Sequence, residues 1–150
     1  LGAIPPLPLA LRDVGVMHLI QRSGDVYTVT YEPRSWYELY LRYKQEFHQA
    51  PGEAVSVYTA IFAPSGISTN IIHEWQRFDE ANGDWITEST VNFPINGGRE
   101  GGYRGYSLKR DVTPGEWRVN VMTGYRQLIG RVAFLVVAVP EKVQLHTGER

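Results

Sequence analysis

Most of the chain alternates between apolar and polar residues with a period of two, the pattern of β-strands that bury one face. The clearest example is the segment 54–63, in which Val55, Val57 and Ile61 share one face. In the segment 70–77, His73 shares a face with Ile71 and Trp75. Both segments are therefore predicted to be strands whose apolar sides point into a common core.

Turn residues separate several further segments of this kind. Asn82-Gly83 is a strong hairpin signal between two such segments. About seven to nine short strands at close spacing indicate an antiparallel β-sandwich. Strands are predicted at 26–31, 54–63, 70–77, 85–91, 103–110, 116–122 and 127–139.

The pattern near the C-terminal end favours an immunoglobulin-like sandwich. Trp117 and Val119 are expected to face inward, while Arg118 and Asn120 face outward. With the strand that follows, this segment resembles the last hairpin of an immunoglobulin-like module, and Trp75 resembles its core tryptophan. The fold class is therefore predicted to be mainly β.

One segment has helical spacing instead. Ser35 is a good N-cap residue, and Glu38 follows it at capping-box spacing. The aromatic residues recur every three or four positions, so one short amphipathic helix is predicted over 35–44. Aromatic side chains that this helix leaves exposed would form an interaction surface; the candidates are Trp36, Tyr37 and Tyr40.

The 150 residues suit one domain. Residues 1–22 begin with a proline-rich stretch that bars a regular helix up to Pro8, and we interpret them as a leader or connector. Residues 23–140 are assigned to a single β-sandwich domain, and residues 141–150 to a polar tail.

Composition narrows the range of functions. The net charge is −1, which gives no electrostatic case for nucleic acid binding. The absence of cysteine excludes disulfides, thiolate metal sites and thiol catalysis. The charge is uneven: 25–88 carries four basic and ten acidic residues, whereas 99–131 carries seven basic and three acidic ones. A basic face for an anionic ligand is one interpretation, and a solvated surface with mutually attracting halves is the other.

The glycine and aromatic spacing resembles a known bacterial family. Four stretches carry the resemblance within 54–137: IIHEWQ, GGREGGYRGYS, TPGEWRVNV and LIGRVAF. They resemble the family catalogued as domain of unknown function 2914. The leader IPPLPLAL is similar to the segment that follows membrane spans in a membrane-bound branch of that family. The resemblance implies a membrane-attached bacterial protein with this domain outside the cytoplasm, and it implies no catalytic residues.

The segment 97–106 is the candidate binding loop. Its glycines would allow a ligand to approach the backbone. Arginines can hold a carboxylate, sulfate or phosphate through paired hydrogen bonds, and tyrosines can stack on a sugar ring. The candidate ligand-binding residues are Arg99, Tyr103, Arg104 and Tyr106. A glycine-bearing bulge between two strands, with its arginines paired to carboxylates, is the structural alternative.

Catalytic and metal-binding signatures are not found in the sequence. No two histidines have the spacing of a local zinc pair, and no cofactor motif is present. His73 could act as a base, although a strand histidine is more often structural. Ser107 has no evident base nearby, and a glycosidase-type pair of Glu74 and Glu88 has very little support. The chain is therefore predicted not to be an enzyme and to need no cofactor or metal.

Three functions remain open. The first is a non-enzymatic binding module for a glycan or an anionic polymer, held by the loop 97–106. The second is a structural domain that contacts its own membrane part or another copy of itself. A hydrolase is the third and the least supported.

Overall fold

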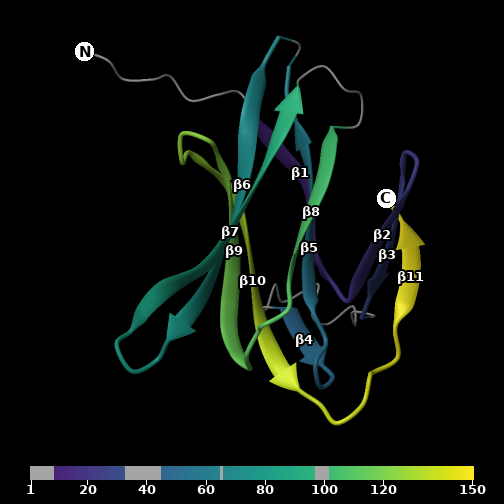
Figure 1. The fold of residues 1–150 in the computed structure, drawn as a ribbon, viewed down its shortest axis with the longest axis vertical. Coiled ribbons are helices and arrows are strands. Elements are labelled where there is room, and N and C mark those ends of the chain that lie inside the picture. Colours follow the sequence, from purple (N-terminus) through teal and green to yellow (C-terminus); the bar gives the residue numbers. More distant parts are fainter. Residues whose placement is uncertain (1–8, 33–44, 65, 97–101) are drawn as a thin grey trace.

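The expected alternation produces β-strands throughout the described part of the chain. The structure is a computed structural model, and it describes residues 9–32, 45–64, 66–96 and 102–150. Within these ranges, eleven strands form three sheets, which Figure 1 shows from left to right as a large, a central and a small sheet. The helix predicted over 35–44 lies outside the described residues, and so do Trp36, Tyr37, Tyr40 and Arg99.

The central sheet has the order β1-β5-β8, and both pairs are antiparallel. Its middle strand is buried on both faces, as its unbroken run of buried residues shows. Val57 and Ile61 point toward the large sheet, and Tyr58 and Ala60 point toward the small sheet. The strands are β1 (Ala10–Met17), β5 (Val55–Phe62) and β8 (Tyr103–Lys109).

The large sheet has the order β4-β10-β9-β6-β7. Only the β4–β10 pair is parallel among its described strands. The predicted Asn82-Gly83 turn joins β6 to β7 as part of a four-residue loop, and Gly83 takes the left-handed φ of 70° that favours glycine. The strands are β4 (Gln45–Gln49), β6 (Ser68–Asp79), β7 (Asp84–Asn96), β9 (Gly115–Thr123) and β10 (Leu128–Ala138).

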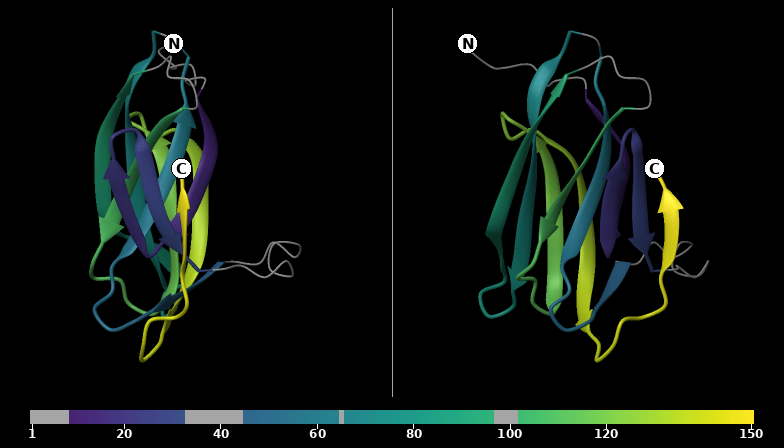
Figure 2. Two further views of the ribbon diagram at one scale, coloured as in Figure 1. Left: turned by 90° about the vertical axis from the view of Figure 1, so that its right-hand side faces the viewer. Right: turned by 45° about the vertical axis from the view of Figure 1, so that its right-hand side comes forward.

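The small sheet has the order β11-β3-β2. The chain leaves the central sheet at Met17, passes through His18 and enters the small sheet at Leu19. Figure 2 shows the β2–β3 hairpin and β11 together on one side of the molecule. The strands are β2 (Leu19–Ser23), β3 (Val26–Tyr31) and β11 (His146–Glu149).

Two apolar cores separate the three layers. Trp75, Trp117 and Phe134 are fully buried between the central and the large sheets, which confirms the prediction that Trp75 is a core residue. A second core fills the space between the central and the small sheets; its buried members are Met17, Ile20, Tyr27, Val29, Tyr58 and Ala60. The small sheet is therefore part of the packed fold.

The sandwich extends into both ranges that the sequence assigned to a leader and a tail. Strands β1 and β2 begin at Ala10 and Leu19, and β11 spans His146–Glu149. A bulge interrupts the period-two pattern of β1, and β11 is a short polar strand that pairs with β3. Hydrophobic periodicity in the sequence therefore does not reveal β1 or β11.

Candidate functional site

The strand β8 divides the residues of the predicted binding loop between two faces. Successive side chains in a strand point in opposite directions. Tyr103 is half-buried against the core that contains Ile61, whereas Arg104 and Tyr106 point to the opposite face. Because Arg99 is outside the described residues, the structure brings only Arg104 and Tyr106 together from the predicted set.

Two glycines of this segment have a packing role. Gly102 has a φ of 87°, and a Cβ atom there would lie 2.9 Å from the carbonyl oxygen of Ile61. A Cβ atom on Gly105 would lie 2.6 Å from the ring of Phe93. Both contacts are closer than real Cβ atoms allow, so these glycines let β8 approach β5 and β7.

Replacing Gly102 by alanine is expected to destabilise the domain by about 2–4 kcal/mol, because backbone strain and a backbone clash act together. Gly66 provides the matched control, since its φ is 84° and a Cβ atom added there would meet no other atom within 4 Å. Gly66→Ala should show only the conformational cost of about 1 kcal/mol. Denaturant unfolding of both variants measures the difference, and equal losses would contradict the proposed clash.

A β-bulge in β1 places two charged residues on the same face. The register between β1 and β5 shifts between Leu11 and Asp13, so Arg12 has no partner on β5. Leu11 and Val14 both pack into the core beside the large sheet. The two residues between them, Arg12 and Asp13, therefore both point to the opposite face, which is a common use of bulges beside binding sites.

Arg104 lies on that same face. Asp13 is paired with Ala60 on β5, and Ala60 is paired with Arg104 on β8, so the three form one row across the central sheet. The small alanine in the middle leaves a hollow between the charged side chains. Tyr58 contributes to its wall, and burial raises the pKa of this phenol to about 12, with the negative charge of Asp13 adding to the effect.

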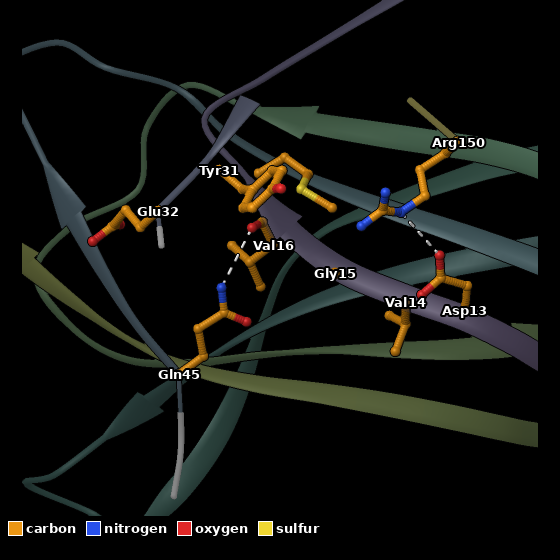
Figure 3. A pocket seen from close by; sticks show the side chains of 9 residues that line it. Asp13, Val14, Gly15, Val16, Tyr31, Glu32, Gln45 and Arg150 are labelled. Carbon is orange, nitrogen blue, oxygen red and sulfur yellow. Dashed lines mark hydrogen bonds and ion pairs between the residues drawn. The ribbon is translucent and has the colours of Figure 1, made fainter. Parts of the chain in front are cut away.

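Arg150 reaches the hollow from the small sheet. The Arg150 backbone is hydrogen-bonded to Tyr27 through both its N–H and its carbonyl group. Its Nε atom lies 3.4 Å from Oδ2 of Asp13, and a dashed line marks this ion pair in Figure 3. Arg104 donates from Nη1 to the Arg150 carbonyl oxygen at 2.6 Å, and its guanidinium stands 5.1 Å above the Tyr27 ring. Arg104 is thereby held in place before any ligand binds.

We call this hollow the arginine cleft; its volume is about 510 Å³. Three arginines and one aspartate line it, so its side chains carry two positive charges in excess. The residues of the arginine cleft are Arg12, Asp13, Tyr58, Ala60, Gly102, Arg104 and Arg150. Sequence reasoning found Arg104 but not Arg12 or Arg150, because strand pairing alone brings these three together.

A second hollow adjoins the arginine cleft and shares Asp13 and Arg150 with it. Its volume is about 440 Å³, and it follows β1 along five consecutive residues (Figure 3). We call it the edge groove. It is lined by Asp13, Val14, Gly15, Val16, Met17, Tyr31, Glu32, Gln45 and Arg150.

A histidine–glutamate cluster lies at one end of the edge groove. Nδ1 of His18 is 2.8 Å from Glu53 Oε2, and Nε2 is 2.7 Å from Glu32 Oε2. Glu32 also accepts hydrogen bonds from the ring and from the backbone N–H of His48. Two ionised carboxylates on one imidazole are both satisfied when the two ring nitrogens carry protons, so the arrangement favours the cationic form of His18. No local pattern in the sequence signals this cluster, because its members are far apart along the chain.

Burial and hydrogen bonding act in opposite directions on the pKa values of His18 and Glu32 in this cluster. Burial alone would lower the pKa of His18, but the hydrogen bonds to Glu32 and Glu53 outweigh burial and raise it above 6.5. Burial alone would raise the pKa of Glu32, but the hydrogen bonds from His18 and His48 lower it below 4.5. Across the described ranges, no group of three or more such side chains has the geometry of a metal site.

His73 and Ser107 form a buried pair between the central and the large sheets. The His73 side chain is fully buried, its Nδ1 lies 2.7 Å from Ser107 Oγ, and its Nε2 lies 2.9 Å from Thr59 Oγ1. Trp75 Nε1 also donates to Ser107 Oγ at 2.9 Å, so the serine joins His73 and Trp75 in one buried hydrogen-bond network. Burial lowers the pKa of His73 to about 4, which keeps the ring neutral. Sequence reasoning found no base near Ser107, since the two residues lie on different sheets.

The two glutamates considered as a glycosidase pair have separate partners. Glu74 accepts hydrogen bonds from Asn120 and Thr87, whereas Glu88 is bound by Arg77. A register shift beside Trp75 leaves Glu88 without a directly opposite residue on β6 in the strand register. The two carboxylates are thus engaged by different side chains.

The fold and the cleft define a mainly β domain of packed antiparallel sheets. Residues 68–136 match the model of the family described as "Protein of unknown function (DUF2914)", which confirms the resemblance over this range. The matched range runs from β6 into β10 and includes Arg104, while Arg12 and Arg150 lie outside it. The membrane-bound branch of the family stays a prediction.

Solved structures include a similar chain, an immunoglobulin-like protein from Pseudomonas aeruginosa. The TM-score is 0.41 and the sequence identity is 12%; the match covers 86% of this chain and 96% of that chain. A comparison with curated proteins finds no match. Among the helices and strands that the structure describes, no helix is long and apolar enough to span a membrane.

Proposed function

We propose that this domain is a non-enzymatic binding module whose arginine cleft holds the anionic group of a ligand. One observation carries the proposal: Arg12, Arg104 and Arg150, from three different strands or strand ends, line a hollow whose lining contains a single acidic side chain. The bound group would be a carboxylate, phosphate or sulfate, for which the planar guanidinium is the preferred partner.

The arrangement of the cleft supports anion binding over a purely structural use of its arginines. Arg12 is exposed, and its guanidinium lies over the ring of Phe62, 6.0 Å from the ring centre. Arg104 donates to the backbone oxygen of Arg150 and stands over the neutral ring of Tyr27, so no acidic side chain is paired with it there. Asp13 balances one arginine at most, which leaves a site suited to a further negative charge.

The buried His73–Ser107 pair supports the non-enzymatic part of the proposal. Its hydroxyl and imidazole groups are directed to each other and to Thr59 and Trp75, away from either hollow. Both side chains are buried, at 0% and 3% exposure, whereas a catalytic pair needs access to substrate. The pair is better explained as a hydrogen-bonded connection between two sheets.

Equilibrium titration with pyrophosphate and citrate tests the anion site. Arg12→Ala and Arg104→Ala should each weaken binding by about 10-fold or more, because each removes a charge-assisted hydrogen-bond donor. Arg110→Ala is the matched control: it removes the same charge from an exposed position outside the cleft, and its affinity should change by less than about 2-fold. Equal losses of affinity in all three variants would mean that net charge alone explains the binding, and they would contradict an anion site in the arginine cleft.

A further inference from the structure

We propose that a hollow at one end of the large sheet is a binding site for an uncharged sugar ring. The site is separate from the arginine cleft and does not depend on the proposed function. Its volume is about 460 Å³, within the range of about 300–1,000 Å³ that is usual for small-ligand sites. We call it the Tyr125 hollow; it is lined by Ser68, Thr69, Asn70, Pro94, Ile95, Gly124 and Tyr125.

The strand register brings three elements together around the hollow. Asn70, near the beginning of β6, is paired with Pro94 on β7. The next residue, Ile71, is paired with Thr123, the last residue of β9. The turn from β9 to β10 therefore begins beside Asn70, near the upper end of the large sheet in Figure 1. A Cβ atom on Gly124 would lie 3.5 Å from Cβ of Asn70, so the turn packs directly against β6.

The β9–β10 turn holds Tyr125 in an exposed position. Oγ1 of Thr123 accepts hydrogen bonds from the backbone N–H groups of Tyr125 and Gln127, at 3.3 and 3.2 Å. Arg126 has a φ of 64°, a left-handed conformation that is strained for a residue with a side chain. Residues in such conformations are concentrated at ligand sites. The turn therefore presents Tyr125, which is 65% exposed, without first having to be ordered by a ligand.

The polar groups of the hollow are uncharged. Ser68, Thr69 and Asn70 supply hydroxyl and amide groups, and the lining contains no acidic, basic or histidine side chain. Asn70 is exposed, and within the described ranges its side-chain amide has no hydrogen-bond partner. An amide both donates and accepts hydrogen bonds, as a sugar hydroxyl group does. The hollow therefore suits a ligand that carries neutral hydroxyl groups.

The exposed aromatic ring beside these groups favours a sugar over other ligands. The C–H groups on one face of a pyranose pack against the negative face of an aromatic ring, and its hydroxyl groups reach uncharged partners at the rim. An anion would meet no cation in this lining. A proline-rich peptide would also pack on Tyr125, but proline has no N–H group to donate to the Asn70 side-chain oxygen.

Calorimetric titration with three neutral tetrasaccharides tests the Tyr125 hollow. The probes are cellotetraose, maltotetraose and chitotetraose, and at least one of them should bind saturably. Tyr125→Ala should weaken this binding by about 10-fold or more, because the aromatic contact is lost. Tyr125→Phe keeps the ring and should stay within about 3-fold of the wild type. Asn70→Ala should weaken binding by about 5-fold, since it removes a neutral hydrogen-bonding group.

Two further variants separate the Tyr125 hollow from the rest of the surface. Tyr106→Ala is the matched control, because Tyr106 is an exposed tyrosine outside the hollow, and its affinity for the sugar should change by less than about 2-fold. Arg104→Ala should likewise leave sugar binding intact while it weakens pyrophosphate binding, so the two sites can fail independently.

Three results would overturn the sugar site. The first is that none of the three tetrasaccharides binds saturably. The second is that Tyr106→Ala or Arg104→Ala loses as much sugar affinity as Tyr125→Ala, which would place the sugar elsewhere. The third is that decaproline binds in a Tyr125-dependent way while no sugar does, which would assign the hollow to a peptide.

Discussion

Replacing His18 by alanine is expected to lower the free energy of unfolding by about 3–5 kcal/mol, since it removes one partner from a buried ionic network. The His18 side chain is 3% exposed, and those of Glu53 and Glu32 are 8% and 12% exposed. Without the imidazolium, the carboxylates of Glu32 and Glu53 stay in a region of low dielectric. The ring of His48 still binds Glu32, but the imidazole that joined the two carboxylates is gone. The ring of His18 also stacks on Phe47 at 3.9 Å, and this packing is lost as well.

The stabilisation by His18 should depend on pH in a defined direction. The pKa of His18 is raised in the fold, so its contribution is complete below the unfolded value of 6.5 and is lost as the pH rises through the folded value. The pKa of Glu32 is lowered, so its contribution is present above 4.5 and is lost as the pH falls through the folded value. The two contributions are complete together between about pH 4.5 and 6.5.

Urea unfolding at pH 6 and at pH 9 measures this prediction. The gap between wild type and His18→Ala should be larger at pH 6. The matched control is His146→Ala, an exposed histidine on β11, whose change should stay within about 0.5 kcal/mol at both values. A His18→Ala variant as stable as the wild type, or a gap that grows toward pH 9, would show that His18 is not held as a cation.

Replacing His73 by alanine should also cost about 3–5 kcal/mol, because it opens a cavity in the core and leaves buried hydroxyl groups without partners. Thr59 and Ser107 each lose a hydrogen-bond partner, and the edge-to-face contact with the Phe93 ring, 5.0 Å away, disappears. Ser107→Ala should cost about 1–3 kcal/mol, since the Trp75 N–H then has no acceptor.

The pH dependence from His73 has the opposite sign to that from His18. Its pKa falls from 6.5 to about 4, so between these values the unfolded chain binds a proton that the folded domain does not. This histidine alone should therefore remove about 3 kcal/mol of stability as the pH falls from 6.5 to 4.

Comparison of the pH profiles tests the assignment. In His73→Ala, the loss of stability between pH 6.5 and pH 4 should become smaller than in the wild type. A profile that keeps its full slope in this range would mean that another group is responsible, and a variant within about 1 kcal/mol of the wild type would contradict the buried network.

The sequence predicted those parts of the fold in which local pattern and burial agree. The strands β6 and β9 follow the period of two over part of their length, and Trp75 and Trp117 stand where a core requires them, although Val119–Thr123 is buried on both faces. The strand β1 could not be assigned in this way, because its bulge puts Arg12 and Asp13 on one face. The polar strand β11 has no hydrophobic period at all, and only its pairing with β3 defines it.

The candidate site was only partly accessible from the sequence for a related reason. Arg104 was found because glycines and tyrosines surround it, yet two of those glycines serve strand packing. Arg12 and Arg150 stand at opposite ends of the chain and meet Arg104 through the row β1–β5–β8 and through β11. Such long-range juxtapositions depend on register, which a single sequence does not encode in its local spacing.

The most direct test of the arginine cleft is a pyrophosphate titration of the ¹⁵N-labelled domain followed by amide chemical shifts. The expected shifts are concentrated at Arg12, Asp13, Arg104 and Arg150, and they disappear in Arg104→Ala. Shifts centred on the outer face of the large sheet, around Arg118, or the absence of any saturable shift, would contradict an anion site in the cleft.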